Sequence, residues 1–97
     1  MNINKTQNEG IVTLNIEGRL DTVTAPELDK EIGTLADAKE LILDFSKLEY
    51  ISSAGLRVLL SAHKAFAGKG GMTVTNINEI VADIFEVTGF NDILNIK

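Results

Sequence analysis

The sequence predicts an α/β fold with a mixed β-sheet, in the order β-β-α-β-α-β-α-β. Residues 11–18 alternate apolar and polar side chains, which is the period of a strand with one buried face. Residues 53–67 and 78–88 instead place apolar side chains three and four positions apart, as in helices packed on a core. Because such segments alternate along the chain, strand–helix–strand crossovers predict parallel pairing, and an opening hairpin predicts antiparallel pairing.

Residues 1–7 are expected to form the first strand of that hairpin. They connect to the strand at residues 11–18 through Asn8-Glu9-Gly10, which is a turn signal. A chain of 97 residues buries roughly two thirds of its unfolded surface, which is enough for one core. We therefore expect residues 1–97 to form a single domain.

A first helix is predicted to begin after Thr24. Thr24 is a favourable N-cap, and Glu27 three residues later completes a capping box. Val23 and Leu28 have the spacing of a hydrophobic staple. Gly33 lies inside the apolar repeat and indicates either close packing or an early end of the helix.

The next strand and helix carry the densest apolar sequence. Residues 40–46, ELILDFS, are apolar without alternation, which predicts a central strand covered by helices on both faces. A helix is predicted from about Ser53 to Ala67, with Gly68 as the residue that ends it. Its predicted apolar side consists of Leu56, Leu59, Leu60, His63 and Phe66.

The last third of the chain predicts a strand, a helix and an edge strand. Residues 72–77, MTVTNI, form the strand, and Asn78 is positioned to cap the helix that follows. Gly89 is predicted to end this helix, and residues 93–97, ILNIK, to add an edge strand. The helix is expected to bury a stripe made of Ile80, Ile84 and Val87, widened by Val81 and Phe85.

Composition and charge exclude several kinds of site and partner. The net charge of −5 repels nucleic-acid phosphates and anionic lipid surfaces. The chain has no cysteine and only one histidine, His63, which excludes thiolate and multi-histidine metal sites, and we expect no cofactor. No apolar run approaches the ~20 residues that cross a bilayer. We therefore expect a cytoplasmic monomer with no direct nucleic-acid or membrane partner.

Ser53 is the residue at which chemistry is most plausible. As a hydrolase nucleophile it would need a base within hydrogen-bond reach, but His63 lies ten positions along the same predicted helix, roughly 15 Å away at a rise of about 1.5 Å per residue. The sequence YISSAGL also lacks the Gly-x-Ser-x-Gly elbow. The chain is therefore not expected to be an enzyme.

Two interpretations of Ser53 remain from the residues alone. Serine is a preferred helix N-cap, which gives it a purely structural role. The same position would also suit a phosphate, which would face free N–H groups and the positive end of the helix dipole. A phosphate there would add about −1.5 to −2 charge and could disrupt an interface built for a neutral hydroxyl.

Two segments carry a resemblance to a known family. LILDFSKLEYISSAGLRVLL at residues 41–60 resembles the signature of STAS domains, specifically the small anti-sigma factor antagonists of bacteria, and GRLDTVTAPEL at residues 18–28 resembles the family's earlier Gly-x-Leu-Asp segment. The resemblance covers nearly the whole chain. It implies a STAS-type fold, a mixed sheet with helices chiefly on one face.

The resemblance also implies a partner-switching cycle. An unphosphorylated antagonist binds an anti-sigma factor that is also a serine protein kinase and so frees a sigma factor; phosphorylation ends the binding, and a protein phosphatase restores it. Aligned on Gly55 and Leu56, the phosphate acceptor is Ser53, and Asp21 matches an aspartate that lies beside the acceptor and contributes to kinase recognition. Recognition is expected to involve Asp21, Ser52, Ala54, Gly55 and Leu56.

Two positions depart from the family pattern. Ser52 stands where these antagonists commonly have Asp, and Ala54 where they commonly have Ser or Thr. Ser52 is therefore a rival acceptor. The alternative function is a STAS interaction module that works without phosphorylation, as an accessory to a transport or signalling complex.

Overall fold

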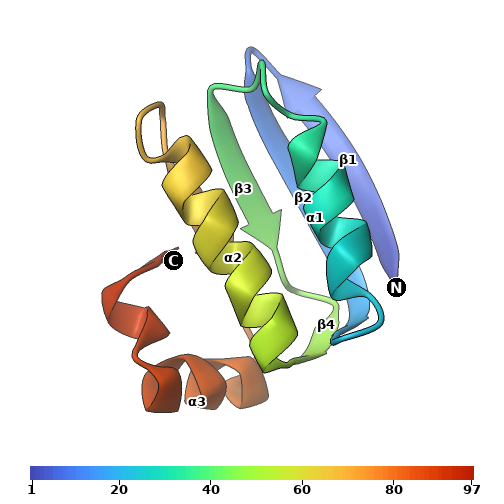
Figure 1. The fold of residues 1–97 in the computed structure, drawn as a ribbon, viewed down its shortest axis with the longest axis vertical. Helices are drawn as coiled ribbons and strands as arrows, with labels where there is room; N and C mark the ends of the chain where they lie inside the picture. Colours follow the sequence, from blue (N-terminus) through green and yellow to red (C-terminus); the bar gives the residue numbers. More distant parts are fainter.

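The computed structural model describes residues 1–97 as one mixed sheet with three α-helices. The strand order is β1-β2-β3-β5-β6, with β4 paired to β2 beyond the end of β3. Helices α1 and α2 lie side by side across one face of the sheet, and α3 lies at the end where β4 is found (Figure 1). The elements are β1 (Asn2–Asn8), β2 (Ile11–Leu20), α1 (Ala25–Gly33), β3 (Glu40–Asp44), β4 (Leu48–Ile51), α2 (Ser53–Phe66), β5 (Met72–Thr75), α3 (Glu79–Thr88), the 3₁₀ helix η1 (Phe90–Asp92) and β6 (Asn95–Ile96).

The opening hairpin is confirmed. β1 and β2 pair antiparallel, with Asn8 opposite Ile11, so that Glu9 and Gly10 form a two-residue loop. Both loop residues have positive φ, +53° and +84°, as the hairpin turn that matches the strand twist requires. Every other strand pair is parallel, which confirms the mixed sheet.

The sheet is covered by helices on one face only. Leu41 and Leu43 of β3 are fully buried, whereas Ile42 between them is only partly buried on the opposite face. The expectation that β3 is covered on both faces by helices is therefore wrong, and the one-sided arrangement implied by the family resemblance is correct. An apolar run of three residues does not distinguish the two cases, because Ile42 is tolerated on a partly exposed sheet surface.

β4 was not predicted from the sequence. It has only four residues, and Leu48 and Ile51 at its two ends are buried. It pairs with the last three residues of β2, and the register shifts between Gly18 and Arg19. Gly18 has a φ of +104°, which a residue with a side chain adopts at a cost. The pairing of β2 with β3 ends at Asn15, and the strand continues beside β4.

The start of α1 differs from the prediction. Thr24 is the N-cap, but its hydroxyl makes no capping bond to the first turn, so the capping box with Glu27 is not formed. Val23 is 86% exposed, which excludes the hydrophobic staple. The helix ends at Gly33, where a Cβ would meet no atom within 4 Å, so the glycine marks an early helix end and not close packing.

The boundaries of α2 and α3 are formed by different capping residues. Asn78 caps α3 as predicted, its Oδ1 accepting a hydrogen bond of 2.8 Å from the Val81 N–H. Gly89, with a φ of +79°, ends that helix as predicted. After α2, however, the left-handed residue is Gly71 and not Gly68, and the Gly71 N–H donates to the Phe66 carbonyl oxygen.

The predicted apolar side of α3 is buried only in part, and Ile84 packs against the core. Val81 and Phe85 are fully buried, whereas Ile80 is 57% and Val87 84% exposed. Because α3 packs at the end of the sheet and not across its face, it buries only a narrow side. The hydrophobic pattern of the helix was wide enough to allow either orientation.

The close approach of α2 to the sheet gives a first prediction. A Cβ at Gly55 would lie 2.8 Å from side-chain carbons of both Ile51 and Leu20 and 3.0 Å from the Leu20 carbonyl oxygen. Gly55→Ala should therefore lower the free energy of unfolding by about 1–3 kcal/mol, as overpacking does. Urea denaturation of the purified variant measures this change.

Gly33→Ala is the matched control for this prediction. Its new methyl group meets nothing within 4 Å, and the glycine is helical, so the substitution should stabilise the protein by about 0.4–1 kcal/mol. Equal effects of the two substitutions would contradict the packing argument.

Candidate functional site

The candidate site lies where β2 and β4 end side by side. Leu20 pairs with Ile51, and the next residue, Ser52, donates its N–H to the Leu20 carbonyl oxygen at 2.9 Å. This pairing places the loop after β2, residues 21–24, beside the first turn of α2. The structure thus joins two segments that are about thirty residues apart in the sequence, and the parallel register of β2 and β4 is what brings them together.

The two serines at the start of α2 have different environments. Ser52 is the N-cap, and its Oγ is buried without a hydrogen-bond partner. Ser53 is the first residue of the helix and is exposed. The prediction that Ser53 caps the helix is therefore wrong by one position. Since no side chain caps α2, unlike α3 with its Asn78, the N–H groups of its first turn are left to solvent or a ligand.

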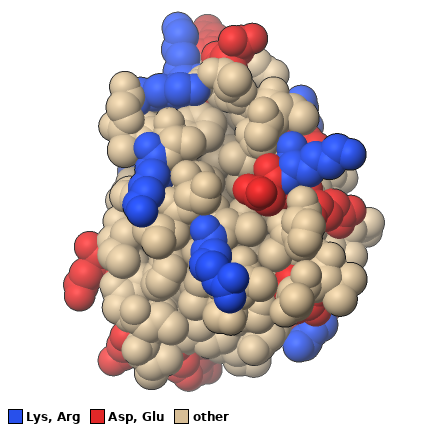
Figure 2. All heavy atoms as spheres, viewed as in Figure 1, with Lys and Arg blue, Asp and Glu red and all other residues tan.

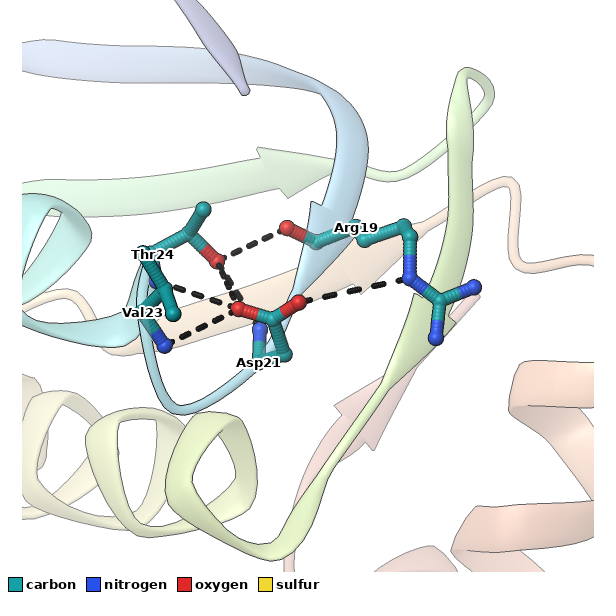
Figure 3. A network of polar contacts seen from close by, with 4 residues as sticks. All are labelled: Arg19, Asp21, Val23 and Thr24. Atoms are coloured by element: carbon teal, nitrogen blue, oxygen red, sulfur yellow. Dashed lines mark hydrogen bonds and ion pairs between the residues drawn. The ribbon is translucent and has the colours of Figure 1, made fainter.

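Asp21 organises the neighbouring loop through its carboxylate (Figure 3). Its Oδ1 accepts hydrogen bonds from the backbone N–H groups of Val23 at 3.0 Å and Thr24 at 3.2 Å. The Asp21 N–H donates to the Thr24 hydroxyl, which itself donates to the Arg19 carbonyl oxygen, both at 2.8 Å. The loop is thus a closed set of short-range bonds, in which the Thr24 hydroxyl completes the turn and makes no capping bond to α1.

These contacts also keep Asp21 charged. The backbone N–H of Thr24 is the main cause that holds the pKa of Asp21 below its ordinary value. Partial desolvation acts in the opposite direction, and the Val23 N–H, the Thr24 hydroxyl and the positive charge of Arg19 all lower the pKa further. Asp21 therefore places a fixed negative charge beside the start of α2 at neutral pH.

Arg19 and Tyr50 extend this cluster across the two strands. Arg19 pairs with Tyr50 in the β2–β4 register, and its guanidinium lies 4.6 Å from the centre of the Tyr50 ring. The Arg19 Nε is 4.0 Å from Oδ2 of Asp21, the one ion pair in the structure. Sequence reasoning did not identify Arg19 or Tyr50, because their contact depends on the unpredicted strand β4.

The other residues predicted to take part in recognition, Ala54, Gly55 and Leu56, are buried or half-buried at the start of α2. Gly55 and Leu56 are buried, and Gly55 lies directly against Leu20 and Ile51. Ala54 is half-buried and packs against the core. These three residues fix the distance between α2 and the sheet, while Ser53 and Asp21 have side chains that reach the surface.

The other surface features do not include the predicted site residues. A groove with a volume of about 340 Å³ lies between α1 and α2, lined by Ile32, Phe66 and Lys69 among others, and it does not include the two serines or Asp21. Charged side chains of both signs are interspersed on the face that carries the helices (Figure 2). No three acidic or histidine side chains are grouped to hold a metal ion, and no helix is both long and apolar enough to span a bilayer.

Comparison with known proteins assigns the family. The model of the STAS domain matches residues 2–97. The anti-sigma-B factor antagonist of Bacillus subtilis is 31% identical over 99 residues, covering 100% of this chain and 91% of that protein. The crystal structure of an anti-sigma factor antagonist from Mycobacterium paratuberculosis has a TM-score of 0.88 at 23% identity, covering 98% of this chain and 83% of that one.

A second solved structure has the same fold in a modified state. The Bacillus cell fate determinant SpoIIAA in its phosphorylated form has a TM-score of 0.76 at 16% identity, covering 99% of this chain and 91% of that chain. The similar solved structures confirm the mixed sheet with helices on one face. The family match confirms the resemblance to STAS domains that residues 18–28 and 41–60 indicate. The chain belongs to the STAS domain family.

Proposed function

We propose that this protein is an anti-sigma factor antagonist that phosphorylation of Ser53 switches off. The observation that carries the proposal is the exposed Ser53 at the uncapped start of α2, beside the ionised Asp21. The relative from Bacillus subtilis named as an anti-sigma-B factor antagonist matches along the whole chain, which supports the same role here. The unphosphorylated protein binds an anti-sigma factor and thereby frees a sigma factor.

The different burial of the two serines supports Ser53 as the acceptor. A kinase must bring the γ-phosphorus of ATP in line with the hydroxyl oxygen that attacks it. The Oγ of Ser52 is buried, so it offers no such approach, whereas Ser53 is exposed. Ser52 acts instead through its backbone, whose N–H and carbonyl groups join β2 to the first turn of α2.

The proposed reaction is a simple phosphoryl transfer. The Oγ of Ser53 attacks the γ-phosphorus of ATP, the bond between that phosphorus and the β,γ-bridging oxygen breaks, and ADP leaves. A base of the kinase takes the hydroxyl proton. This chain is the substrate in that step, and its partner is an anti-sigma factor with serine kinase activity. A protein phosphatase hydrolyses the phosphoserine and returns the antagonist to its binding state.

The position of Ser53 explains how the switch acts without unfolding the protein. The free N–H groups and the positive dipole of the α2 N-terminus accommodate a negative group on its first residue. The partner, however, meets an added charge of about −1.5 to −2 on a surface where Asp21 is already ionised. The same phosphate is therefore compatible with the fold and incompatible with the complex.

The first test of this proposal is site mapping. The purified protein, Ser52→Ala and Ser53→Ala are each incubated with ATP, Mg²⁺ and the anti-sigma kinase encoded in the same genome. We expect one added phosphate on the native chain and on Ser52→Ala, and none on Ser53→Ala, because of the two adjacent serines only Ser53 is exposed. Intact mass spectrometry measures the number of added phosphates, and peptide mapping identifies the modified serine. An unmodified native chain would favour the alternative, a STAS interaction module that works without phosphorylation.

A second test separates the charge from the shape of the side chain. Ser53→Asp should leave the free energy of unfolding within about 0.5 kcal/mol, since an acidic residue in the first turn suits the helix dipole. It should weaken anti-sigma factor binding by about 10-fold or more through like-charge repulsion. Ser53→Asn, neutral and of similar size, is the matched control and should bind normally in calorimetric titration. Normal binding by the Asp variant would contradict the switch.

A third test addresses the role of Asp21 in kinase recognition. Asp21→Asn keeps an Oδ1 that can accept the Val23 and Thr24 N–H groups but removes the charge. We expect near-native stability and a rate of Ser53 phosphorylation lower by about 10-fold or more, as for the loss of one charge-assisted contact. Asp21→Ala should lose both rate and stability. If the Asn variant were phosphorylated at the native rate, the charge of Asp21 would have no part in kinase recognition, and its role would be to hold the loop after β2.

A further inference from the structure

We infer that Arg57 receives the phosphate of phosphorylated Ser53 as an ion pair along the surface of α2. The inference rests on the proposed phosphorylation of Ser53 and assigns a second residue to the phosphorylated state. Ser53 and Arg57 are four positions apart on one helix, and both are exposed. Side chains at this spacing lie on the same face, with Cβ atoms about 5–6 Å apart.

The direction of the pair is the favourable one. Side chains in a helix point back toward its N-terminus, so the Arg57 guanidinium extends over the turn that begins at Ser53. A negative group at position i with a positive group at position i+4 is the better order of the two on a helix. A phosphate also matches the planar fork of a guanidinium, which can donate two parallel hydrogen bonds to it.

Arg57 is free to make this contact. The chain has only two arginines, and the other one, Arg19, is held over the Tyr50 ring and beside Asp21. Arg57 takes no part in an ion pair or in a contact with an aromatic ring, although the chain carries 14 acidic residues. The guanidinium is thus an unengaged cation one helical turn from the modified hydroxyl.

The pair changes what a partner protein meets on this surface. Before phosphorylation, the first two turns of α2 present a neutral hydroxyl at Ser53 and a guanidinium at Arg57 that is in no ion pair. After phosphorylation, the guanidinium is occupied by the phosphate. A single covalent change therefore adds negative charge and withdraws the positive charge of Arg57 from the surface, while the backbone stays in place.

The test uses protein in which phosphoserine is installed at position 53 by genetic-code expansion, so that no kinase is needed. Phosphorus NMR then follows the second pKa of the phosphate, which is about 6 for an unperturbed phosphoserine. Arg57 lowers this pKa and the neighbouring Asp21 raises it. Arg57→Gln should therefore raise the pKa by about 0.5 unit, the size expected for one charge at this spacing in water.

Lys64→Gln is the matched control, because it removes the same charge from the far end of α2. It should leave the phosphate pKa unchanged. An unchanged pKa in Arg57→Gln, or an equal rise in both variants, would overturn the inference. Its failure is distinct from that of the proposed function, since the pair can form on installed phosphoserine whether or not a kinase modifies Ser53, and kinase mapping can succeed whether or not the pair forms.

Discussion

The contact of Gly55 with Leu20 and Ile51 is the constraint on which the rest of the site depends. A side chain at Gly55 would collide with both neighbours at 2.8 Å, so the first turn of α2 can lie against the ends of β2 and β4 only with glycine there. This approach lets the Ser52 N–H reach the Leu20 carbonyl oxygen. The exposed hydroxyl of Ser53 is thereby held in register with the loop that begins at Asp21, one residue after Leu20.

Different contacts hold the two sides of the site in place. The loop after β2 is closed by local bonds among Arg19, Asp21 and Thr24, which need no support from distant residues. The start of α2, in contrast, lacks a side-chain cap and is held by packing and by one backbone bond to β2. A helix start that is fixed in position but uncapped can accept a negative group without reorganising.

The sequence predicts the features of the fold that depend on neighbouring residues, and it does not predict those that depend on contacts between distant segments. The hairpin turn at Glu9-Gly10 and the cap at Asn78 are local signals, and both were predicted correctly. The exposure of Val23 and Val87 could not be predicted, because it depends on where the neighbouring elements lie. The contact between Arg19 and Tyr50 requires the pairing of β4 with β2, and LEYI is too short to indicate a strand by its pattern alone.

The candidate residues themselves illustrate the same limit. The motif aligned on Gly55 and Leu56 pointed to Ser53, with Ser52 as a rival, and the two adjacent serines do not reveal in sequence that one hydroxyl is buried and the other exposed. The proximity of Asp21 came from the family resemblance, because no local pattern links residues about thirty positions apart. The structure adds two observations: the parallel pairing of β2 and β4 brings the loop of Asp21 to the start of α2, and the hydroxyl of Ser52 is buried while Ser53 is exposed.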